Sequence, residues 1–371
     1  MCGIGRYTLN LVKAIANIDS DNEYIVLKHP DYKDTIVDRP NFREIPLAGA
    51  SLPVKSIMTS GSVINRFNPD VYHGLNNHIP FGLDCPRTLL TLHDLNWVYI
   101  VYTNWLETLY KRHVKGRFFT NAVRYAAKKA DIVIAISRET QRRAIDLLEI
   151  PPSKFRLIYH GLDKRFQSGQ MDKPPTSKLL KIISRVAGEQ YIFSFGNSSL
   201  HKNIEGVIRA FNILQTKYPA LMLLIVGRGD RYPALRRLVE ELQLGDRIIF
   251  WSSVTDSKLT DAEIIWLYRH AKMLAFPSFI EGFGYPIVEA MSVGCPVLTS
   301  RISAPQEIAA NDAVLVDPYD VASIATGMEK LLIDKVLRKK LIVSGRRRAA
   351  SFTAEQCANA THELYQCPSR E

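Results

Sequence analysis

The chain has little cysteine. Its five cysteines are scattered over 371 residues, odd in number and without C-x-x-C spacing. A disulfide scaffold needs cysteines in pairs, and a zinc ribbon needs ligands a few residues apart, so the pattern excludes both. Scattered single cysteines are typical of reduced thiols, and we therefore expect a cytoplasmic protein.

Long hydrophobic runs are also lacking. No stretch approaches the ~18 uncharged apolar residues that a membrane-spanning helix requires. The first residues do not show the charged, apolar and small-residue succession of a secretory signal peptide. Apolar residues nevertheless make up 46% of the chain, which is enough for a sizeable core. At this length, two domains of ordinary size are expected.

Acidic residues are outnumbered, with 48 Lys and Arg against 37 Asp and Glu, a formal net charge of +11. Much of the excess lies in residues 111–143 and 335–348. Such segments suit anionic lipid, nucleic acid or an anionic substrate, although solvated helix faces would also explain them. No recognisable nucleic-acid module accompanies them, so we favour peripheral contact with an anionic membrane and expect no nucleic acid.

Strand-like and helix-like segments alternate along the chain. In α/β proteins this order predicts doubly wound parallel sheets, whose functional groups lie at the carboxyl ends of the strands. We expect an N-terminal domain at 1–163, a linker at 164–190 where polar and Pro-Pro sequence breaks the alternation, a second domain at 191–351, and a final helix within 352–371. The expected strands are 24–27, 42–45, 70–73, 87–92, 131–135, 155–159, 191–195, 221–226, 247–251, 273–276, 296–300 and 313–316.

Two carboxylates stand out at 276–297, in the sequence FPSFIEGFGYPIVEAMSVGCPV. An apolar strand ends at Pro277, a glycine-rich turn follows, and Pro286 begins a short apolar helix. Bare backbone N–H groups at a helix N-terminus attract phosphates. Glu281 and Glu289 flank this turn, where they suit hydrogen bonds from sugar hydroxyls. In isolation, each would be an ordinary helix charge, but Glu289 lies among residues that look buried and needs a partner there.

An earlier turn of the same half offers a cation. Gly196, Asn197, Ser198 and Ser199 follow a strand, and His201-Lys202-Asn203 begins the next helix. Lys202 is a point charge beside a helix start, where it suits a diphosphate. A solvated lysine is the alternative.

The 276–297 stretch closely resembles the E-x7-E signature of the retaining GT-B glycosyltransferases, the glycosyl transferases group 1 family. The resemblance extends from GIGRYTLNL through ADIVIAIS and HGLD to LVDP. It implies two Rossmann-like domains facing across a cleft and a final helix that crosses back to the first. Glu289 would hold the ribose hydroxyls. Glu281 and the amides of Gly282, Phe283 and Gly284 would hold the donor sugar and phosphates.

The same resemblance implies further roles. Lys202 would stabilise the leaving diphosphate, with Asn197 and Ser198 beside it, and His93 would lie near the transferred sugar, next to Asp94. Asp94 and Ser137 are assigned to the acceptor side, and Ser137 is also predicted to cap a helix. A glycine turn at Gly3 and Gly5 would contact the donor.

Two departures from the family pattern bear on activity. Many relatives have an arginine near position 197, where this chain has Asn197, so either His201 supplies a second cation or Lys202 acts with backbone amides alone. Relatives also carry a strand before the glycine turn. The chain as given starts at that turn, which suggests a clipped start and an unfilled place in the first sheet.

The resemblance thus predicts a retaining, metal-independent hexosyltransferase without a cofactor, whose partners are a nucleotide-sugar donor and a glycan or lipid-linked acceptor. GDP-mannose is the leading donor, and the inner face of the cytoplasmic membrane is the expected location. No DxD pair or hydrolase triad is apparent. The alternatives are another GT-B enzyme, such as a phosphorylase or nucleotide-sugar epimerase, a non-catalytic partner subunit, and, last, a nucleic-acid-binding module.

Overall fold

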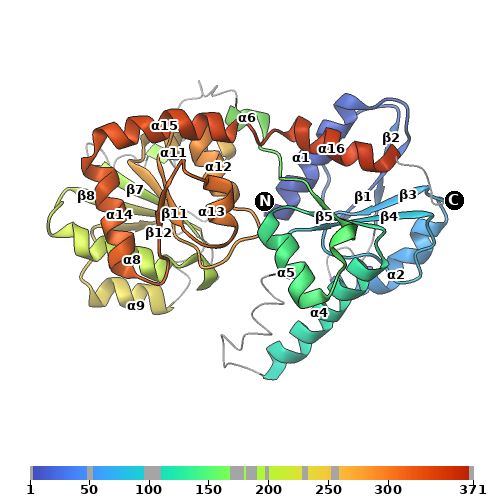
Figure 1. Ribbon diagram of the computed structural model, residues 1–371, viewed down its shortest axis with the longest axis horizontal. Helices are drawn as coiled ribbons and strands as arrows, with labels where there is room; N and C mark the ends of the chain where they lie inside the picture. The colour runs from blue at the N-terminus through green and yellow to red at the C-terminus, as the bar shows by residue number, and fades with distance from the viewer. Residues whose placement is uncertain are drawn as a thin grey trace. The chain divides into compact units, whose positions relative to one another are not determined.

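The computed structural model describes residues 3–47, 53–95, 110–167, 179–180, 190–196, 200–227, 233–251 and 259–366. The chain divides into two compact units (Figure 1). Unit 1 comprises Met1–Gly161 and Thr353–Glu371, and unit 2 comprises Leu162–Phe352. Most of the predicted linker at 164–190 lies outside the described residues. Its first part is helix α6 (Lys164–Gln167), which belongs to unit 2 and buries Phe166.

Unit 2 contains one six-stranded sheet in the order β12-β11-β10-β7-β8-β9, and every pairing is parallel. The chain runs outward from β7 in one direction and outward from β10 in the other. The direction of winding therefore reverses between these two strands, and ligands of open α/β sheets bind at the carboxyl ends of the strands that flank such a reversal. The strands are β7 (Gln190–Phe195), β8 (Leu221–Val226), β9 (Ile248–Phe250), β10 (Met273–Phe276), β11 (Val297–Ser300) and β12 (Val314–Val316).

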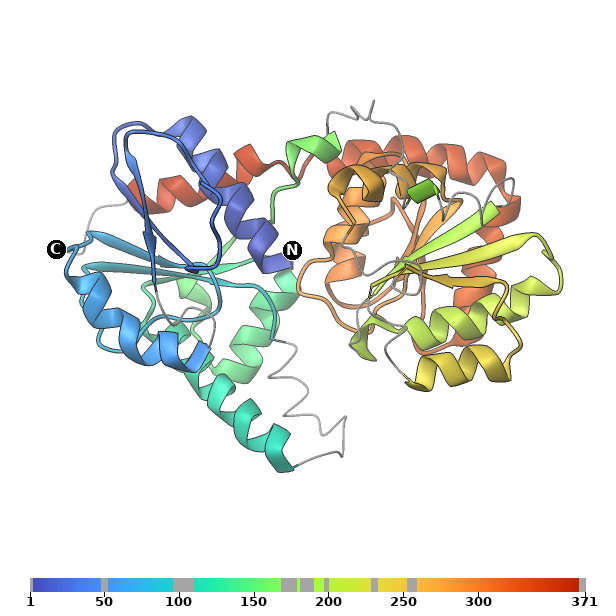
Figure 2. The same ribbon diagram turned by 180° about the vertical axis from the view of Figure 1, so that it is seen from behind.

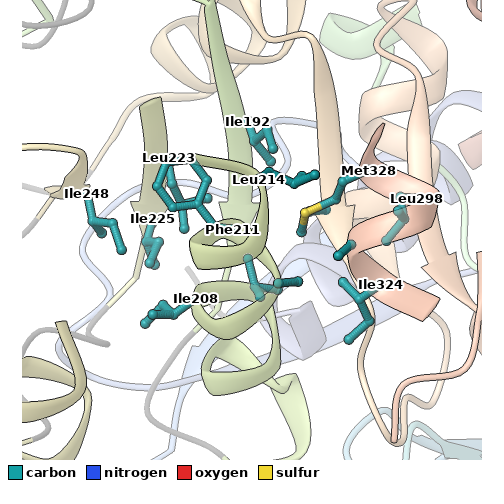
Figure 3. Packing of buried hydrophobic residues seen from close by; sticks show 14 of the residues in the cluster. Ile192, Ile208, Phe211, Leu214, Leu223, Ile225, Ile248, Leu298, Ile324 and Met328 are labelled. Carbon is teal, nitrogen blue, oxygen red and sulfur yellow. The ribbon is translucent and has the colours of Figure 1, made fainter. Parts of the chain in front are cut away.

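The strands of unit 2 are apolar on both faces because helices cover both sides of the sheet. The described helices of this unit, besides α6, are α8 (Ile204–Gln215), α9 (Pro233–Glu241), α11 (Asp261–His270), α12 (Tyr285–Ser292), α13 (Ser303–Ala309), α14 (Val321–Ile333) and α15 (Lys335–Ala349). Phe211 and Leu214 of α8 and Met328 of α14 are buried against the sheet residues Ile192 and Leu298 (Figure 3). This core fixes the strand ends from which the site is built.

Unit 1 carries its strands in two sheets, where a doubly wound domain predicts one. The pair β1 (Tyr24–Lys28) and β2 (Phe42–Pro46) forms one sheet, and β3 (Val71–Gly74), β4 (Arg87–Leu92), β5 (Ile132–Ala135) and β6 (Phe155–Leu157) form the other, all parallel. The described helices of the unit are α1 (Gly3–Ile18), α2 (Pro53–Asn65), α4 (Tyr110–Lys129), α5 (Arg138–Leu148) and α16 (Ala354–Gln366).

A side chain of α16 contacts the first strands of both sheets. The Tyr365 hydroxyl lies 2.7 Å from Nδ1 of His73 on β3, and its ring centroid lies 6.5 Å from that of Tyr24 on β1. The side chain thus links the two sheets without a backbone ladder. α16 also packs along α1 within unit 1 (Figure 2).

No helix in the described ranges is long and apolar enough to cross a membrane.

Candidate functional site

The loops that follow β7 and β10 meet at an ion pair. Lys202, at the end of a short 3-10 helix (Leu200–Lys202), donates from Nζ to both carboxylate oxygens of Glu281, at 2.7 and 2.9 Å. Only 18% of the lysine side chain and 8% of the glutamate side chain are exposed. The ammonium group also lies 5.0 Å from the ring centroid of Phe276, on the sheet beneath. Two residues 79 positions apart therefore form a buried ion pair at the carboxyl ends of β7 and β10, where the direction of winding of the sheet reverses.

Asn203 holds these loops together, a role that sequence reasoning missed. Its side-chain N–H groups donate to the carbonyls of Pro277, at 3.0 Å, and Pro318, at 2.7 Å. Its side-chain oxygen accepts from the N–H of Gly206 and so caps α8. The backbone adds a further tie, because the N–H of Phe279 donates to the carbonyl of His201. The loops that follow β7, β10 and β12 are thereby held together beside Lys202.

Glycine is required at two points of this arrangement. A Cβ at Gly206 would come within 2.4 Å of the Asn203 side-chain oxygen, so a larger residue would displace the cap. Gly284 has φ of 102°, a conformation that side chains with a Cβ rarely adopt, and it is the residue from which α12 begins. The predicted glycine turn and helix are confirmed, with Pro286 one residue later in the helix than predicted.

Glu289 lies in the second turn of α12 and is 3% exposed. The expectation that it is buried and has a partner is confirmed, since the hydroxyl of Tyr268 on α11 donates to its carboxylate at 3.3 Å. The ring of Phe283 is also buried and packs edge-on against Phe352 and Tyr285. Any contact of Phe283 with a polar ligand must therefore use its backbone.

His201 does not supply a second positive charge near pH 7. Burial lowers the pKa of His201 below its usual value of 6.5, and the nearby Lys202 ammonium lowers it further, against the opposing effect of Glu281. Its imidazole is therefore neutral, and among the described residues the charge of Lys202 is balanced by the Glu281 carboxylate. Asn197 and Ser198 lie outside the described residues.

A cluster of three buried rings lies at the carboxyl ends of β4 and β6 in unit 1. The rings of His93, His160 and Tyr7 lie 4.6 to 5.2 Å apart, and all three are buried. Nε2 of His93 lies 2.7 Å from the carbonyl of Leu75, which can only accept, so Nε2 carries the proton. Nδ1 is then an acceptor, and no described group donates to it.

Burial keeps His93 neutral, because it lowers the pKa of this imidazole to about 4 against the opposing effect of the Leu75 carbonyl. A neutral ring with a fixed proton leaves Nδ1 as a buried acceptor, which can receive a hydrogen bond from a hydroxyl group that reaches it. The sequence predicted the position of His93 at a strand end, but the partners that fix its tautomer come from the loop after β3 and could not be read from it.

The remaining predicted residues of unit 1 occupy ordinary structural positions. Ser137 caps α5 as predicted. Its hydroxyl accepts from the N–H of Thr140 and donates to the Thr140 hydroxyl, both at 3.0 Å. Asp94 is half-buried, and its backbone carbonyl accepts from the Asn77 side chain. Gly3 and Gly5 lie within the first turn of α1, so the prediction that they form a turn before the helix is wrong.

Among the residues that the structure describes, no three His, Cys, Asp or Glu side chains gather in a way that could hold a metal ion.

Two known families match consecutive parts of the chain. Residues 1–166 match Glycosyltransferase Family 4, and residues 177–348 match Glycosyl transferases group 1. O-antigen chain mannosyltransferase B of Escherichia coli is 26% identical over 98% of this chain and 96% of its own.

Solved structures share the fold. WaaG, a glycosyltransferase involved in lipopolysaccharide biosynthesis, is 16% identical with a TM-score of 0.74 over 99% of this chain and 96% of its own. HepE from Anabaena, in complex with UDP and glucose, is 16% identical with a TM-score of 0.68 over 99% and 96%. The architecture is therefore GT-B, as the sequence predicted.

Proposed function

The protein belongs to the glycosyl transferases group 1 family of GT-B glycosyltransferases, and from that premise we propose that it is a retaining hexosyltransferase. It moves a sugar from a nucleoside-diphosphate donor to a hydroxyl of a glycan or lipid-linked acceptor during polysaccharide assembly. Mannose from GDP-mannose is the proposed donor. This choice is supported by similarity to an O-antigen chain mannosyltransferase along nearly the whole chain.

The observation that carries the proposal is the buried Lys202–Glu281 pair between the carboxyl ends of β7 and β10. A cation and an acceptor-only carboxylate there offer complementary contacts, since Lys202 suits a diphosphate and Glu281 suits sugar hydroxyls. The glycine-led N-terminus of α12 adds N–H groups for phosphate oxygens. Glu289 then takes the ribose hydroxyls.

In the proposed reaction, the bond between the anomeric carbon and the diphosphate oxygen breaks, and a bond to the acceptor oxygen forms on the same face. The proton of the acceptor hydroxyl passes to the departing phosphate. Lys202 stabilises the charge that develops on the leaving group, a contribution that is largest in a water-excluded site. No resident metal is invoked, because an ammonium group and helix N–H groups supply the same neutralisation.

His93 is the residue of unit 1 to which we assign a direct role in sugar transfer. Its Nδ1 lone pair is proposed to accept a hydrogen bond from a hydroxyl of the transferred sugar or of the acceptor. Asp94 stays a weaker acceptor-side proposal. Work on a lipid-linked acceptor would place the protein in the cytoplasm, at the inner face of the membrane.

A screen of nucleotide sugars tests the donor assignment. GDP-mannose at a hundredfold excess over its Kd should stabilise the folded protein by about 2.7 kcal/mol and raise its Tm by several degrees. GDP should retain part of this effect, and UDP-glucose should show less. A larger shift with UDP-glucose than with GDP-mannose would reject mannose.

Product analysis then separates the rival functions. A retaining transferase forms a new glycoside with α configuration from an α-linked donor, whereas an epimerase releases a free or isomerised sugar without an acceptor. A phosphorylase consumes or releases inorganic phosphate. Donor binding without turnover on any acceptor would favour a non-catalytic partner subunit.

Glu289→Gln tests the ribose assignment. Glutamine keeps the size of the side chain and an oxygen for the Tyr268 hydroxyl, so the fold should be retained. Loss of the carboxylate charge should weaken donor binding roughly 10- to 100-fold, because hydrogen bonds to charged groups contribute about 1.5–3 kcal/mol.

The matched control is Glu205→Gln on α8, an exposed glutamate whose carboxylate contacts Arg209 one turn away. It should bind the donor like the unaltered protein when both are titrated by calorimetry. Wild-type affinity in Glu289→Gln would remove Glu289 from the donor site.

A further inference from the structure

Helix α15 carries one sign of charge only. Its sequence KVLRKKLIVSGRRRA contains seven cations and no acidic residue. One side of the helix is buried through Leu341, Gly345 and Ala349, and it packs against α12 and α14 within unit 2. Both views of the molecule show the helix along the rim of this unit (Figures 1 and 2).

Three of the arginines attach the helix to its own unit. Arg338 donates to the carbonyls of Leu331 and Leu332 at the end of α14. Arg348 donates to the carbonyls of Glu307 and Ile308 of α13, and Arg346 donates to the carbonyl of Val293 after α12. These contacts make α15 a fixed platform, so the direction of its outer face is set by the fold.

The outer face combines the other four cations with exposed aliphatic side chains. Val336 is 80% exposed and Val343 is 71% exposed, which is unusual for two apolar residues two turns apart on one helix. Ile333, at the end of α14, is 61% exposed. The cations of this face are Lys335, Lys339, Lys340 and Arg347, all exposed. Val336, Lys340, Val343 and Arg347 follow one another at positions i, i+4, i+7 and i+11, which is a single stripe.

Two acidic side chains near the start of this face, Asp334 and Glu329, bind groups other than its cations. The Asp334 carboxylate accepts from the N–H of Leu337 and so caps α15. Glu329 of α14 is bound by Lys217 and by the hydroxyl of Tyr218. At the start of the helix, Lys335 and Arg338 lie close enough to Lys272 to lower its pKa, after the larger effect of burial. The face is therefore strongly positive.

We propose that this outer face of α15 docks the protein on the surface of an anionic lipid bilayer. Cations attract the phosphate headgroups, and the interleaved valines and Ile333 enter the boundary between headgroups and acyl chains, as in interfacial helices. A nucleic acid fits less well, because α15 has no aromatic side chain on which a base could stack. The proposal goes beyond sugar transfer, since docking requires neither donor nor acceptor.

Co-sedimentation with vesicles tests the proposal on the full chain. Vesicles of phosphatidylcholine mixed with phosphatidylglycerol should bind the protein at about 0.1 M salt, and vesicles of phosphatidylcholine alone should not. Each cation near an anionic surface contributes roughly a fivefold increase in the binding constant. The double substitution Lys339→Glu with Lys340→Glu should therefore weaken binding by at least about twentyfold.

The matched control reverses two neighbouring arginines elsewhere in unit 2, with Arg236→Glu and Arg237→Glu on the exposed side of α9. It makes the same change in net charge and should leave vesicle binding within about twofold. An equal loss in both variants would show that overall charge, and not this face, is responsible, and would overturn the proposal.

A second variant tests the apolar part without altering charge. Val336→Ser with Val343→Ser should weaken vesicle binding severalfold and make it more sensitive to salt. Unchanged binding would overturn the role of the valines. Stronger retention on a random RNA than on the anionic vesicles would overturn the bilayer as the partner.

Discussion

Replacing Lys202 with methionine is expected to lower kcat/KM for sugar transfer about a thousandfold. Among the described residues at the switch point of unit 2, Lys202 is the cation that can meet a departing diphosphate, because burial keeps His201 neutral. Methionine retains the apolar stem over Phe276 but removes the charge. Single groups that stabilise developing charge in a preorganised site contribute about 100- to 1,000-fold to kcat. Initial rates with a labelled donor measure the effect.

The same substitution should also destabilise the protein, for a separate reason. It leaves the Glu281 carboxylate buried without its cation, since only 8% of that side chain is exposed. Removing one partner of a buried ion pair costs about 3–5 kcal/mol. Loss of activity in the single variant is therefore not enough to assign a role to Lys202.

The double variant Lys202→Met with Glu281→Gln separates the two effects. Neutralising both partners removes the uncompensated charge, so thermal stability should return close to that of the unaltered protein while transfer stays lost. A surface pair supplies the control. Lys217 binds Glu329 with 64% of its side chain exposed, and Lys217→Met should change neither Tm nor kcat appreciably. Recovery of transfer in the double variant would contradict the assigned role of Lys202.

The identity of this pair could be predicted from the sequence, but the pairing itself could not. Lys202 and Glu281 were each singled out by the turn in which they lie. Their contact depends on β7 and β10 being neighbours in the sheet, and strand order is a property of the whole unit. Asn203 was missed because two of its three side-chain hydrogen bonds go to carbonyls 74 and 115 residues away, and such contacts give no local signal. The third is the local cap of α8, accepted from the Gly206 N–H.

For the fold too, features that depend on neighbouring residues could be predicted, and features that depend on distant residues could not. The strands at 87–92, 221–226 and 273–276 have the predicted bounds, and the other strands begin and end within two residues of them, because buried apolar runs between turns are a local pattern. The division of unit 1 into two sheets agrees with the expected unfilled place in its first sheet, whereas the contacts of Tyr365 with both β1 and β3 were not predicted, because they come from the end of the chain. For residues 335–348 the sequence indicates only a basic segment, whereas in the structure they form a helix that is fixed to unit 2.

Unit 1 is expected to lose stability steeply as the pH falls from 6.5 toward 4.5. Three of its histidines are neutral in the folded state, with His93 and His160 buried and His73 half-buried. Burial lowers the pKa of His93 to about 4, that of His73 to about 3, and that of His160 well below 6.5, with a further contribution from His93 to the latter two. In the unfolded chain, each should titrate near 6.5.

The direction follows from proton binding. Below pH 6.5 the histidines bind protons in the unfolded state but not in the folded state. Falling pH therefore favours unfolding until the folded-state pKa is reached. For His93 alone this amounts to about 3 kcal/mol by pH 4. Three such groups together approach the whole stability of an ordinary domain.

Asp19 acts at lower pH. Burial would raise its pKa, but hydrogen bonds from Tyr24, Asn22, the Asp21 N–H and His362 hold it well below its usual value, so its contribution is lost only below about pH 4.

Urea unfolding at several pH values between 7.5 and 4.5 measures the loss, and hydrogen exchange locates it. Amides of β4 and β5 should lose protection on acidification before those of β7 and β8, because His73, His93 and His160 all lie in unit 1. His93→Gln should flatten the pH dependence by roughly one third, since a glutamine amide can still donate to the Leu75 carbonyl but does not titrate. His270→Gln is the control, as that imidazole is exposed on α11 in unit 2. Equal flattening by both substitutions, or stability that does not change down to pH 4.5, would mean that the three rings are not held neutral by burial.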